Sequence, residues 1–339
     1  MVTIKQLAEL CGVSRGTVDR VLNNRGKVNP EKAELIRRTA ERLNYQPNPA
    51  GKALIARRKN LTVAIVMPSV GIAFFDDVIA ALRQAEQKYA LFGLKVIWRL
   101  SRGYDVAVQA AALDELADEV QALIINPIDD PHIVEKINGC VSRGIFVVTL
   151  NNDTPQSKRH AYVGPDYRSG GETAGELMSI LAGTPKTFGV TLGSRQILGH
   201  RLRLEGFVHA IQKIPGARIA AVWEDGDDDI QGYETTKTML TQHPEIDALF
   251  LASSGGAYGT CRAVRALHSE NDLRIVAFDT TPPIVEMMKA HVIDAVLYQH
   301  PHTQGTRAMQ LVYDYLFNGI ESDHDQHIMQ NEIRLLANL

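Results

Sequence analysis

The first 45 residues place apolar positions at helical spacing in three short segments. A capping box of Thr3 and Gln6 opens the first segment, which ends at Gly12. Ser14 can cap the second segment, and residues 29–31 open the third with an N-cap asparagine, a proline and an acid. The apolar faces consist of Ile4, Leu7, Ala8, Cys11, Val18, Val21, Leu22, Ala33, Ile36, Ala40 and Leu43. The pattern predicts three short helices around one small core.

The second of these predicted helices leaves Arg15, Gly16 and Arg20 on its outer face. Three short helices with a basic outer face have the shape that fits the major groove of DNA. We therefore predict a helix-turn-helix headpiece over residues 1–46, followed by a hinge helix or linker over residues 47–60.

Beyond residue 60, short apolar runs alternate with amphipathic stretches of roughly 10 to 18 residues. The expected strands are Thr62 to Met67, Lys95 to Trp98, Ala122 to Ile125, Phe146 to Leu150, Thr187 to Leu192, Ala248 to Ala252, Arg274 to Phe278 and Ala295 to Tyr298. A further strand is expected within residues 330–339. This alternation indicates an α/β fold in which helices cover both faces of parallel sheets.

Polar residues gather in the loops that directly follow the predicted strands. These loops contain Asn126-Pro127, Asn151-Asn152-Asp153, Ser253-Ser254-Gly255-Gly256 and Asp279-Thr280. In open α/β sheets, ligands bind at the carboxyl edge, where such loops lie. The loops therefore indicate a ligand site.

Charge divides the chain into a basic head and an acidic body. Residues 1–59 hold 13 Lys or Arg and 5 Asp or Glu, a net charge of +8. The remaining residues hold 23 basic and 34 acidic side chains, a net charge of −11. The head can therefore release counterions from DNA phosphates, whereas the body is repelled by them.

Length and composition limit the class of protein further. The 339 residues exceed one typical core, so we expect two or three packing units. The polar N-terminus argues against a secretory signal, and no apolar run approaches the length that spans a membrane. Cys11, Cys140 and Cys261 are far apart and lack metal-ligand spacing, so we expect reduced, partly buried thiols in a cytoplasmic protein without a metal site.

The headpiece resembles that of the lactose-repressor and purine-repressor family, through the letters GVSRGTVDRVLNNRGKVNPEKAELIRRTAERLNYQPN. Residues 61–339 resemble the ribose-binding-protein type of periplasmic sugar receptor. The resemblance implies a dimer that reads DNA and carries a two-lobed ligand-sensing and dimerisation domain. Its N-lobe is expected at about 61–164 plus 294–322, and its C-lobe at about 165–293 plus 323–339.

The same resemblance implies which residues contact DNA. Arg15 and Gly16 fall at the two variable base-reading positions, and Arg20 falls on the major-groove arginine, whose forked donors suit guanine. Leu54 matches the hinge leucine that enters the minor groove and bends the duplex. The other DNA contacts implied are Thr3, Thr17, Asn23, Tyr45, Asn48 and Lys52.

The resemblance also implies a set of ligand contacts. Phe74-Phe75 matches an aromatic pair after the first strand, and Arg203 matches an arginine that clamps sugar hydroxyls. Asp279 and Gln299 match an acid and an amide at two later strand ends. The remaining expected contacts are Asn126, Asn151, Asp166, Asp227 and Ser253.

Two of these positions depart from the family pattern. Ser253 stands where many relatives have asparagine, and Asp227 stands near the position of a stacking aromatic. The ligand is therefore expected to be unusually polar, or cationic. The acidic run 225–229 that contains Asp227 is more easily explained as a solvated loop than as a cation site.

Two other classes of protein fit these features less well. An enzyme is disfavoured because G-x-x-x-x-G-K-[ST], G-x-S-x-G and G-x-G-x-x-G after a strand are all absent from the sequence. A sugar-binding transport receptor would have no use for a helix-turn-helix. The sequence thus predicts a homodimeric repressor without a cofactor, which binds pseudo-palindromic operator DNA and responds to a sugar, polyol or derivative. A corepressor-dependent regulator of the purine-repressor kind remains an alternative.

Overall fold

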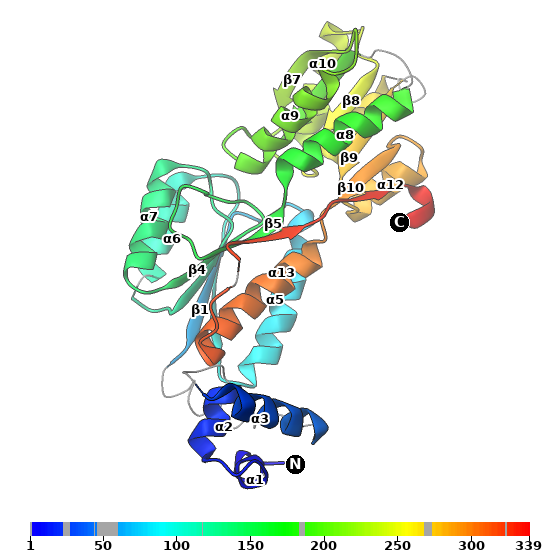
Figure 1. Cartoon of the computed structure of the whole chain (residues 1–339). Coiled ribbons are helices and arrows are strands. Elements are labelled where there is room, and N and C mark those ends of the chain that lie inside the picture. The colour runs from blue at the N-terminus through cyan, green and yellow to red at the C-terminus, as the bar shows by residue number, and fades with distance from the viewer. Residues whose placement is uncertain are drawn as a thin grey trace.

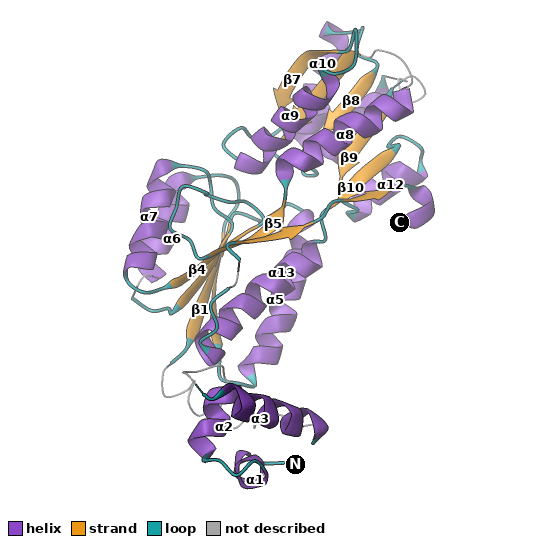
Figure 2. Ribbon diagram, viewed as in Figure 1, coloured by secondary structure: helices purple, strands orange, loops and turns teal. Residues whose placement is uncertain are grey.

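The computed structural model describes residues 2–22, 28–43, 45, 60–116, 118–182, 187–267, 273–322 and 324–339. Over these ranges the chain forms a three-helix headpiece and two α/β lobes joined by several crossing segments (Figure 1 and Figure 2). The predicted α/β class is confirmed.

The headpiece consists of α1 (Ile4–Leu10), α2 (Arg15–Leu22) and α3 (Pro30–Arg42). The capping box of Thr3 and Gln6 is present, and the Ser14 hydroxyl accepts from the Thr17 amide at 3.1 Å. Asn29 caps α3 by accepting from the two amides that follow Pro30. The core contains Leu7, Ala8, Cys11, Val18, Val21, Ile36 and Ala40, so the predicted apolar faces are confirmed.

The N-lobe is a parallel sheet with the strand order β11-β5-β4-β3-β1-β2. Its strands are β1 (Thr62–Met67), β2 (Lys95–Leu100), β3 (Ala122–Ile125), β4 (Phe146–Leu150), β5 (Ala161–Pro165) and β11 (Gln326–Met329). One face packs against α5 (Phe74–Ala90) and α13 (Pro301–Tyr313), which continues as a π-helical turn over Asp314–Asn318. The other face packs against α6 (Val106–Leu116) and α7 (Pro131–Ser142).

The C-lobe repeats this three-layer plan with the strand order β12-β10-β9-β8-β6-β7. Its strands are β6 (Thr187–Leu192), β7 (Arg218–Glu224), β8 (Ala248–Leu251), β9 (Arg274–Phe278), β10 (Ala295–Tyr298) and β12 (Glu332–Arg334), of which β12 is antiparallel. One face packs against α8 (Tyr167–Ala182) and α9 (Leu198–Ile211). The other packs against α10 (Asp229–Gln242), α11 (Ala257–Ala266) and α12 (Pro282–Lys289). The chain ends in a 3₁₀ turn over Leu336–Asn338.

The lobe boundaries near the C-terminus differ from those expected, because β10 and β11 each lie in the opposite lobe to the one expected. Strand β10 was expected in the N-lobe but pairs with β9 and β12 in the C-lobe sheet. Residues 323–339 were expected in the C-lobe, but β11 within this segment pairs with β5 in the N-lobe sheet. The chain changes lobe after β10, at His300, whose backbone is left-handed (φ 56°) and precedes Pro301. The boundary prediction was wrong because the pairing partner, which local sequence does not specify, decides the lobe.

Strands β5, β7 and β11 were not predicted from the sequence. Strand β7 lies at an edge of its sheet and is only partly buried, although residues 219–223 are all apolar. None of the helices in the described part of the chain is long and apolar enough to cross a membrane.

Close packing of α8 against α9 requires glycine where the two helices meet. A Cβ at Gly206 would lie 2.1 Å from the carbonyl oxygen of Arg168, and a Cβ at Gly171 would lie 2.0 Å from that of Arg203. Backbone atoms cannot yield as a flexible side chain can. This packing therefore fixes the backbone of α9 near Arg203.

Gly206→Ala should destabilise the protein by about 1 to 3 kcal/mol, because the added methyl forces α8 and α9 apart. The matched control is Gly139→Ala in α7, where the nearest atom to a new Cβ is a side-chain nitrogen 3.8 Å away. The control should be neutral or stabilising by about 0.5 to 1 kcal/mol. Thermal melting measures both, and equal melting temperatures for the two variants would contradict the packing argument.

Candidate functional site

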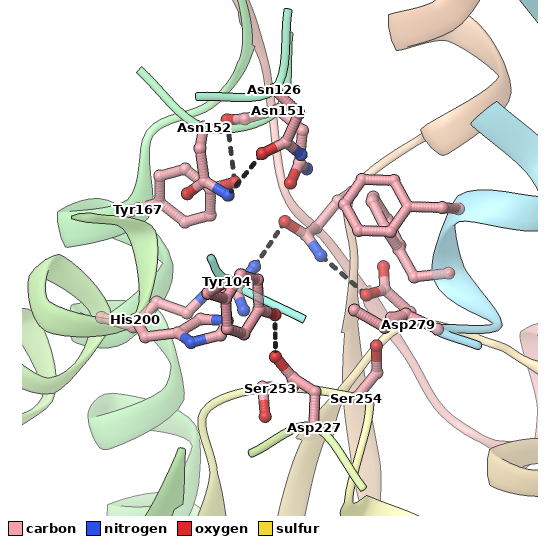
Figure 3. Close-up of a pocket in the computed structure, with 15 residues that line it drawn as sticks. Tyr104, Asn126, Asn151, Asn152, Tyr167, His200, Asp227, Ser253, Ser254 and Asp279 are labelled. Atoms are coloured by element: carbon pink, nitrogen blue, oxygen red, sulfur yellow. Dashed lines mark hydrogen bonds between the residues drawn. The ribbon is translucent and has the colours of Figure 1, made fainter. Parts of the chain in front are cut away.

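A cavity lies between the lobes, at the carboxyl ends of their strands (Figure 3). Its wall consists of Ile72, Phe74, Phe75, Tyr104, Asn126, Asn151, Asn152, Tyr167, His200, Arg203, Asp227, Ser253, Ser254, Asp279 and Gln299. Nine of the ten predicted ligand residues are therefore brought together. Asp166 is not: it is exposed, and its carboxylate accepts from the Ser169 amide at the start of α8.

The N-lobe contributes aromatic rings and amides to this cavity. Phe74 and Phe75 begin α5 and pack edge to face, with centroids 5.1 Å apart. Asn126 follows β3, and Gln109 fixes this loop by donating to the Asn126 carbonyl and accepting from the Ile128 amide, both at 2.9 Å. The Asn126 side-chain oxygen accepts from Asn152 at 3.2 Å. Its amide nitrogen therefore remains available to a ligand.

Arg203 projects from α9 and is only 4% exposed. One Nη donates to the carbonyl of Ala252 at 2.6 Å, and the other donates to the side-chain oxygen of Gln299. The guanidinium lies over the Phe278 ring, 3.6 Å from its centroid. Burial lowers the pKa of Arg203 from its ordinary value, although nearby carboxylates oppose this effect. The contacts hold a planar donor group in a fixed orientation.

Gln299 connects Arg203 to Asp279, because its side-chain nitrogen donates to Asp279 Oδ2 at 2.7 Å. Asp279 follows β9 in a left-handed conformation (φ 67°) and is 2% exposed. Burial raises the pKa of its carboxyl to about 7. An arginine, an amide and an acid thus line one side of the cavity.

The acidic run 225–229 is not the solvated loop that we expected, because Asp225 and Asp227 are both buried. Asp225 accepts from the Asp227 amide at 2.9 Å, and burial raises its pKa to about 7. Asp227 is left-handed (φ 56°) and accepts from the Tyr104 hydroxyl of the other lobe. Glycines make the room: a Cβ at Gly193 would lie 2.1 Å from Asp227 Oδ2. The burial of Asp225 and Asp227 was not predicted, because it arises from contacts with distant loops.

His200 lies beside this acidic loop and is buried in α9. Its Nδ1 lies 3.1 Å from the Ser194 amide nitrogen and 3.2 Å from the Ser194 carbonyl oxygen, so the ring is held by the backbone of Ser194. Burial lowers the pKa of His200, so the ring is neutral near pH 7. It offers the cavity a neutral polar ring.

Four buried polar atoms of the cavity wall have no hydrogen-bond partner within the described ranges. They are Asn126 Nδ2, Arg203 Nε, Ser253 Oγ and Asp279 Oδ1. Buried polar groups are normally paired, and an unpaired one costs about 1–3 kcal/mol. Two nitrogen donors, a hydroxyl and a carboxyl oxygen around one cavity fit a ligand that carries several hydroxyl groups.

Six wall residues were missed by the sequence analysis: Ile72, Tyr104, Asn152, Tyr167, His200 and Ser254. Asn152 and Ser254 are adjacent to predicted residues, in loops already identified as a possible ligand site. Tyr104 and His200 carried no such signal, since neither directly follows a strand.

Polar contacts cross the cleft and join the lobes. Tyr104 donates to Asp227, and Arg201 in the C-lobe forms an ion pair with Asp129 in the N-lobe. The Gly199 amide donates to the Asn152 side chain at 3.2 Å. The lobes are therefore held together across the cavity by the residues that line or border it.

On the headpiece, α2 presents Arg15, Gly16 and Arg20 to solvent, as predicted. The Arg20 Nε donates to the Gly16 carbonyl at 3.1 Å. Thr3 is exposed at the α1 cap, and Thr17 is partly buried. Tyr45 packs against the headpiece core, and this burial raises the pKa of its hydroxyl. The predicted contacts Asn23, Asn48, Lys52 and Leu54 lie outside the described residues.

The described residues contain no group of three His, Cys, Asp or Glu side chains that could hold a metal ion. Cys11, Cys140 and Cys261 are free and buried, which confirms the prediction for the thiols.

A helix-turn-helix headpiece joined to a two-lobed domain with a polar cleft defines a transcriptional regulator that senses a small molecule. Residues 3–48 match the bacterial regulatory proteins of the lacI family, and residues 63–319 match the periplasmic binding protein domain. The chain belongs to the periplasmic binding protein family through its sensing domain and carries an N-terminal helix-turn-helix domain of the lacI family of bacterial regulators. Members of the lacI family bind operator DNA, act as dimers and are not enzymes.

Individual proteins agree with this assignment. The chain is 27% identical over 295 residues to the HTH-type transcriptional regulator GalS of Salmonella typhimurium, covering 83% of this chain and 81% of that protein. The lactose operon repressor of Escherichia coli is 26% identical over 284 residues, which cover 83% and 76%. The solved structure of GanP, a glucose-galactose binding protein from Geobacillus stearothermophilus, has a TM-score of 0.76 at 24% identity and covers 82% and 98%.

The raised pKa values of Asp225 and Asp279 predict a pH dependence of stability. Both folded pKa values are about 7, above the ordinary 3.8, so the folded state keeps protons that the unfolded state releases between these values. Stability therefore falls as pH rises through this window. Asp279→Asn should reduce the fall in melting temperature between about pH 5.5 and 7.5, because an asparagine side chain cannot ionise.

The exposed Asp76→Asn variant, at the start of α5, is the control for removing one carboxylate. Because His200 also titrates with a shifted pKa, the comparison is between each variant and the parent protein. A parent-like pH profile for Asp279→Asn would mean that the carboxyl ionises freely in the folded protein.

Proposed function

We propose that this regulator represses transcription in the cytoplasm and that a sugar, polyol or related molecule, bound in the cleft, controls its affinity for operator DNA. The observation that carries the proposal is the set of four unpartnered polar atoms around a cavity that also contains Phe74 and Phe75. Apolar faces with a few fixed donors and acceptors suit a polyhydroxyl ring. Lactose and glucose-galactose in the names of two similar proteins support the same class of ligand.

Control of DNA binding follows from where the ligand would bind. A molecule in the cleft touches both lobes and changes the balance of the contacts that cross it, such as Tyr104 with Asp227. A change in lobe angle across a dimer moves the attachment points of the two headpieces. The hinge helix and its Leu54 contact with the minor groove remain part of this proposal.

Direct base reading by α2 is the first part of the proposal to test. Arg20→Ala should weaken binding to an operator, selected from random-sequence DNA, by about 1–3 kcal/mol and relax the preference at one base position of each half-site. Binding to random DNA should change much less. Fluorescence anisotropy on both DNAs measures the difference.

The control for a general loss of charge is Arg42→Ala, at the exposed end of α3, which should affect both DNAs equally. Equal losses on operator and random DNA for Arg20→Ala would show that Arg20 contacts phosphate only.

The cleft is tested by Arg203→Ala. A screen of sugars and polyols should first identify a ligand that raises the melting temperature. At a hundredfold excess over Kd, such a ligand adds about 2.7 kcal/mol to the free energy of unfolding. Arg203→Ala should then abolish both this shift and the ligand effect on operator binding, while ligand-free operator binding stays intact. The control is Arg168→Ala, an exposed arginine paired with Glu205 on the outer side of α8. Unchanged ligand affinity of Arg203→Ala in calorimetry would place the site elsewhere.

A further inference from the structure

The two ends of the cavity differ in charge balance. At one end, the Arg203 guanidinium and the Asp279 carboxyl are bridged by Gln299. At the other end, the carboxylate of Asp227 accepts from the hydroxyl of Tyr104, which is neutral. No ion pair to Asp227 exists within the described ranges of the chain. The neutral ring of His200 does not supply a positive charge either.

Asp227 is held at this position by its surroundings. Its left-handed backbone (φ 56°) turns the side chain into the cavity, and it is only 9% exposed. The loop fits closely around it, since a Cβ at Gly255 would lie 2.4 Å from the Asp227 Cβ. The carboxylate cannot escape into solvent without moving this loop. Asp227 interacts electrostatically with the Arg203 guanidinium but forms no ion pair with it, so burial of this carboxylate stays costly unless a cation approaches more closely.

An independent observation marks the same end of the cavity as a binding position. Ser253 is 4% exposed, and within the described structure its Oγ has no hydrogen-bond partner. Figure 3 shows Ser253 beside Asp227, away from Asn126, Asn151 and Asn152. A carboxylate and a hydroxyl together are acceptors for a primary ammonium, which has three donors and no acceptor.

We propose that Asp227 and Ser253 select an effector that carries a protonated amine on its polyhydroxyl frame, such as an amino sugar or an amino polyol. The inference rests on the proposed function of the cleft and specifies its ligand further. The ammonium pairs with Asp227, and the hydroxyl groups use Asn126, Arg203 and Asp279 at the other positions. Anionic sugars, such as sugar phosphates and sugar acids, are disfavoured by repulsion from the same carboxylate.

The test compares matched amine and neutral ligands. Calorimetry measures the affinity of the full-length protein for D-glucosamine and D-glucose, D-galactosamine and D-galactose, D-mannosamine and D-mannose, and glucamine and sorbitol. N-acetylglucosamine provides a neutral substituent of larger size at the amine position. In the pair that fits best, the amine should bind about tenfold tighter or more, which corresponds to about 1.4 kcal/mol.

Three variants assign this preference to the carboxylate. Asp227→Asn should reduce the amine-to-neutral ratio to near one while retaining the affinity for the neutral member. Tyr104→Phe should keep the preference, because the carboxylate remains. Asp129→Asn removes the carboxylate that pairs with Arg201 across the cleft but does not line the cavity, so it should change both affinities equally and leave their ratio unchanged.

Each outcome decides between the inference and the function on which it rests. Neutral members that bind as tightly as the amines would overturn the amine selection and leave the proposed sugar-type effector standing. A preference that persists in Asp227→Asn would assign the selection to another group. Binding of no compound in any pair would contradict the proposed class of effector and the inference with it. Melting of the ligand-free variants shows whether each one is folded.

Discussion

The sensing domain depends on the buried guanidinium of Arg203. It joins α9 to the loop after β8, through the Ala252 carbonyl, and to the end of β10, through Gln299. Burial of a charge is costly, and here the two paired Nη groups and the Phe278 ring offset part of that cost. The close α8–α9 packing at Gly171 fixes the helix backbone from which Arg203 extends. In the proposed function, structural order at the strand ends and ligand recognition therefore depend on the same side chain.

Ligand binding and lobe geometry are coupled because they use neighbouring residues. Asp227 lines the cavity and accepts from Tyr104 of the opposite lobe, and Asn152 lines it while accepting from the Gly199 amide. A ligand that competes for these groups changes the free energy difference between lobe arrangements. The coupling needs no distant pathway within the domain, since the cleft contacts are themselves the contacts between lobes.

Much of the site could be predicted because ligand residues of α/β sheets follow the strands. Buried apolar runs located β3, β8 and β9, and hence Asn126, Ser253 and Asp279 at their carboxyl ends. Tyr104 and His200 could not be found in this way, since each reaches the cavity through the path of a loop or helix over the sheet. Asp166 was misassigned because a polar residue after a strand can equally cap the next helix.

The sequence alone determined features whose interactions span a few residues. The capping box of Thr3 and Gln6 and the buried central strands are of this kind, because the hydrogen bonds of the cap and the apolar run of each strand lie within one segment. Only the tertiary structure decided the lobe of β10 and β11 and the burial of Asp225 and Asp227. Strand β11 pairs with β5, more than a hundred residues earlier, and Asp227 meets Tyr104 of the other lobe. Such contacts depend on how separate segments meet, which no local pattern specifies.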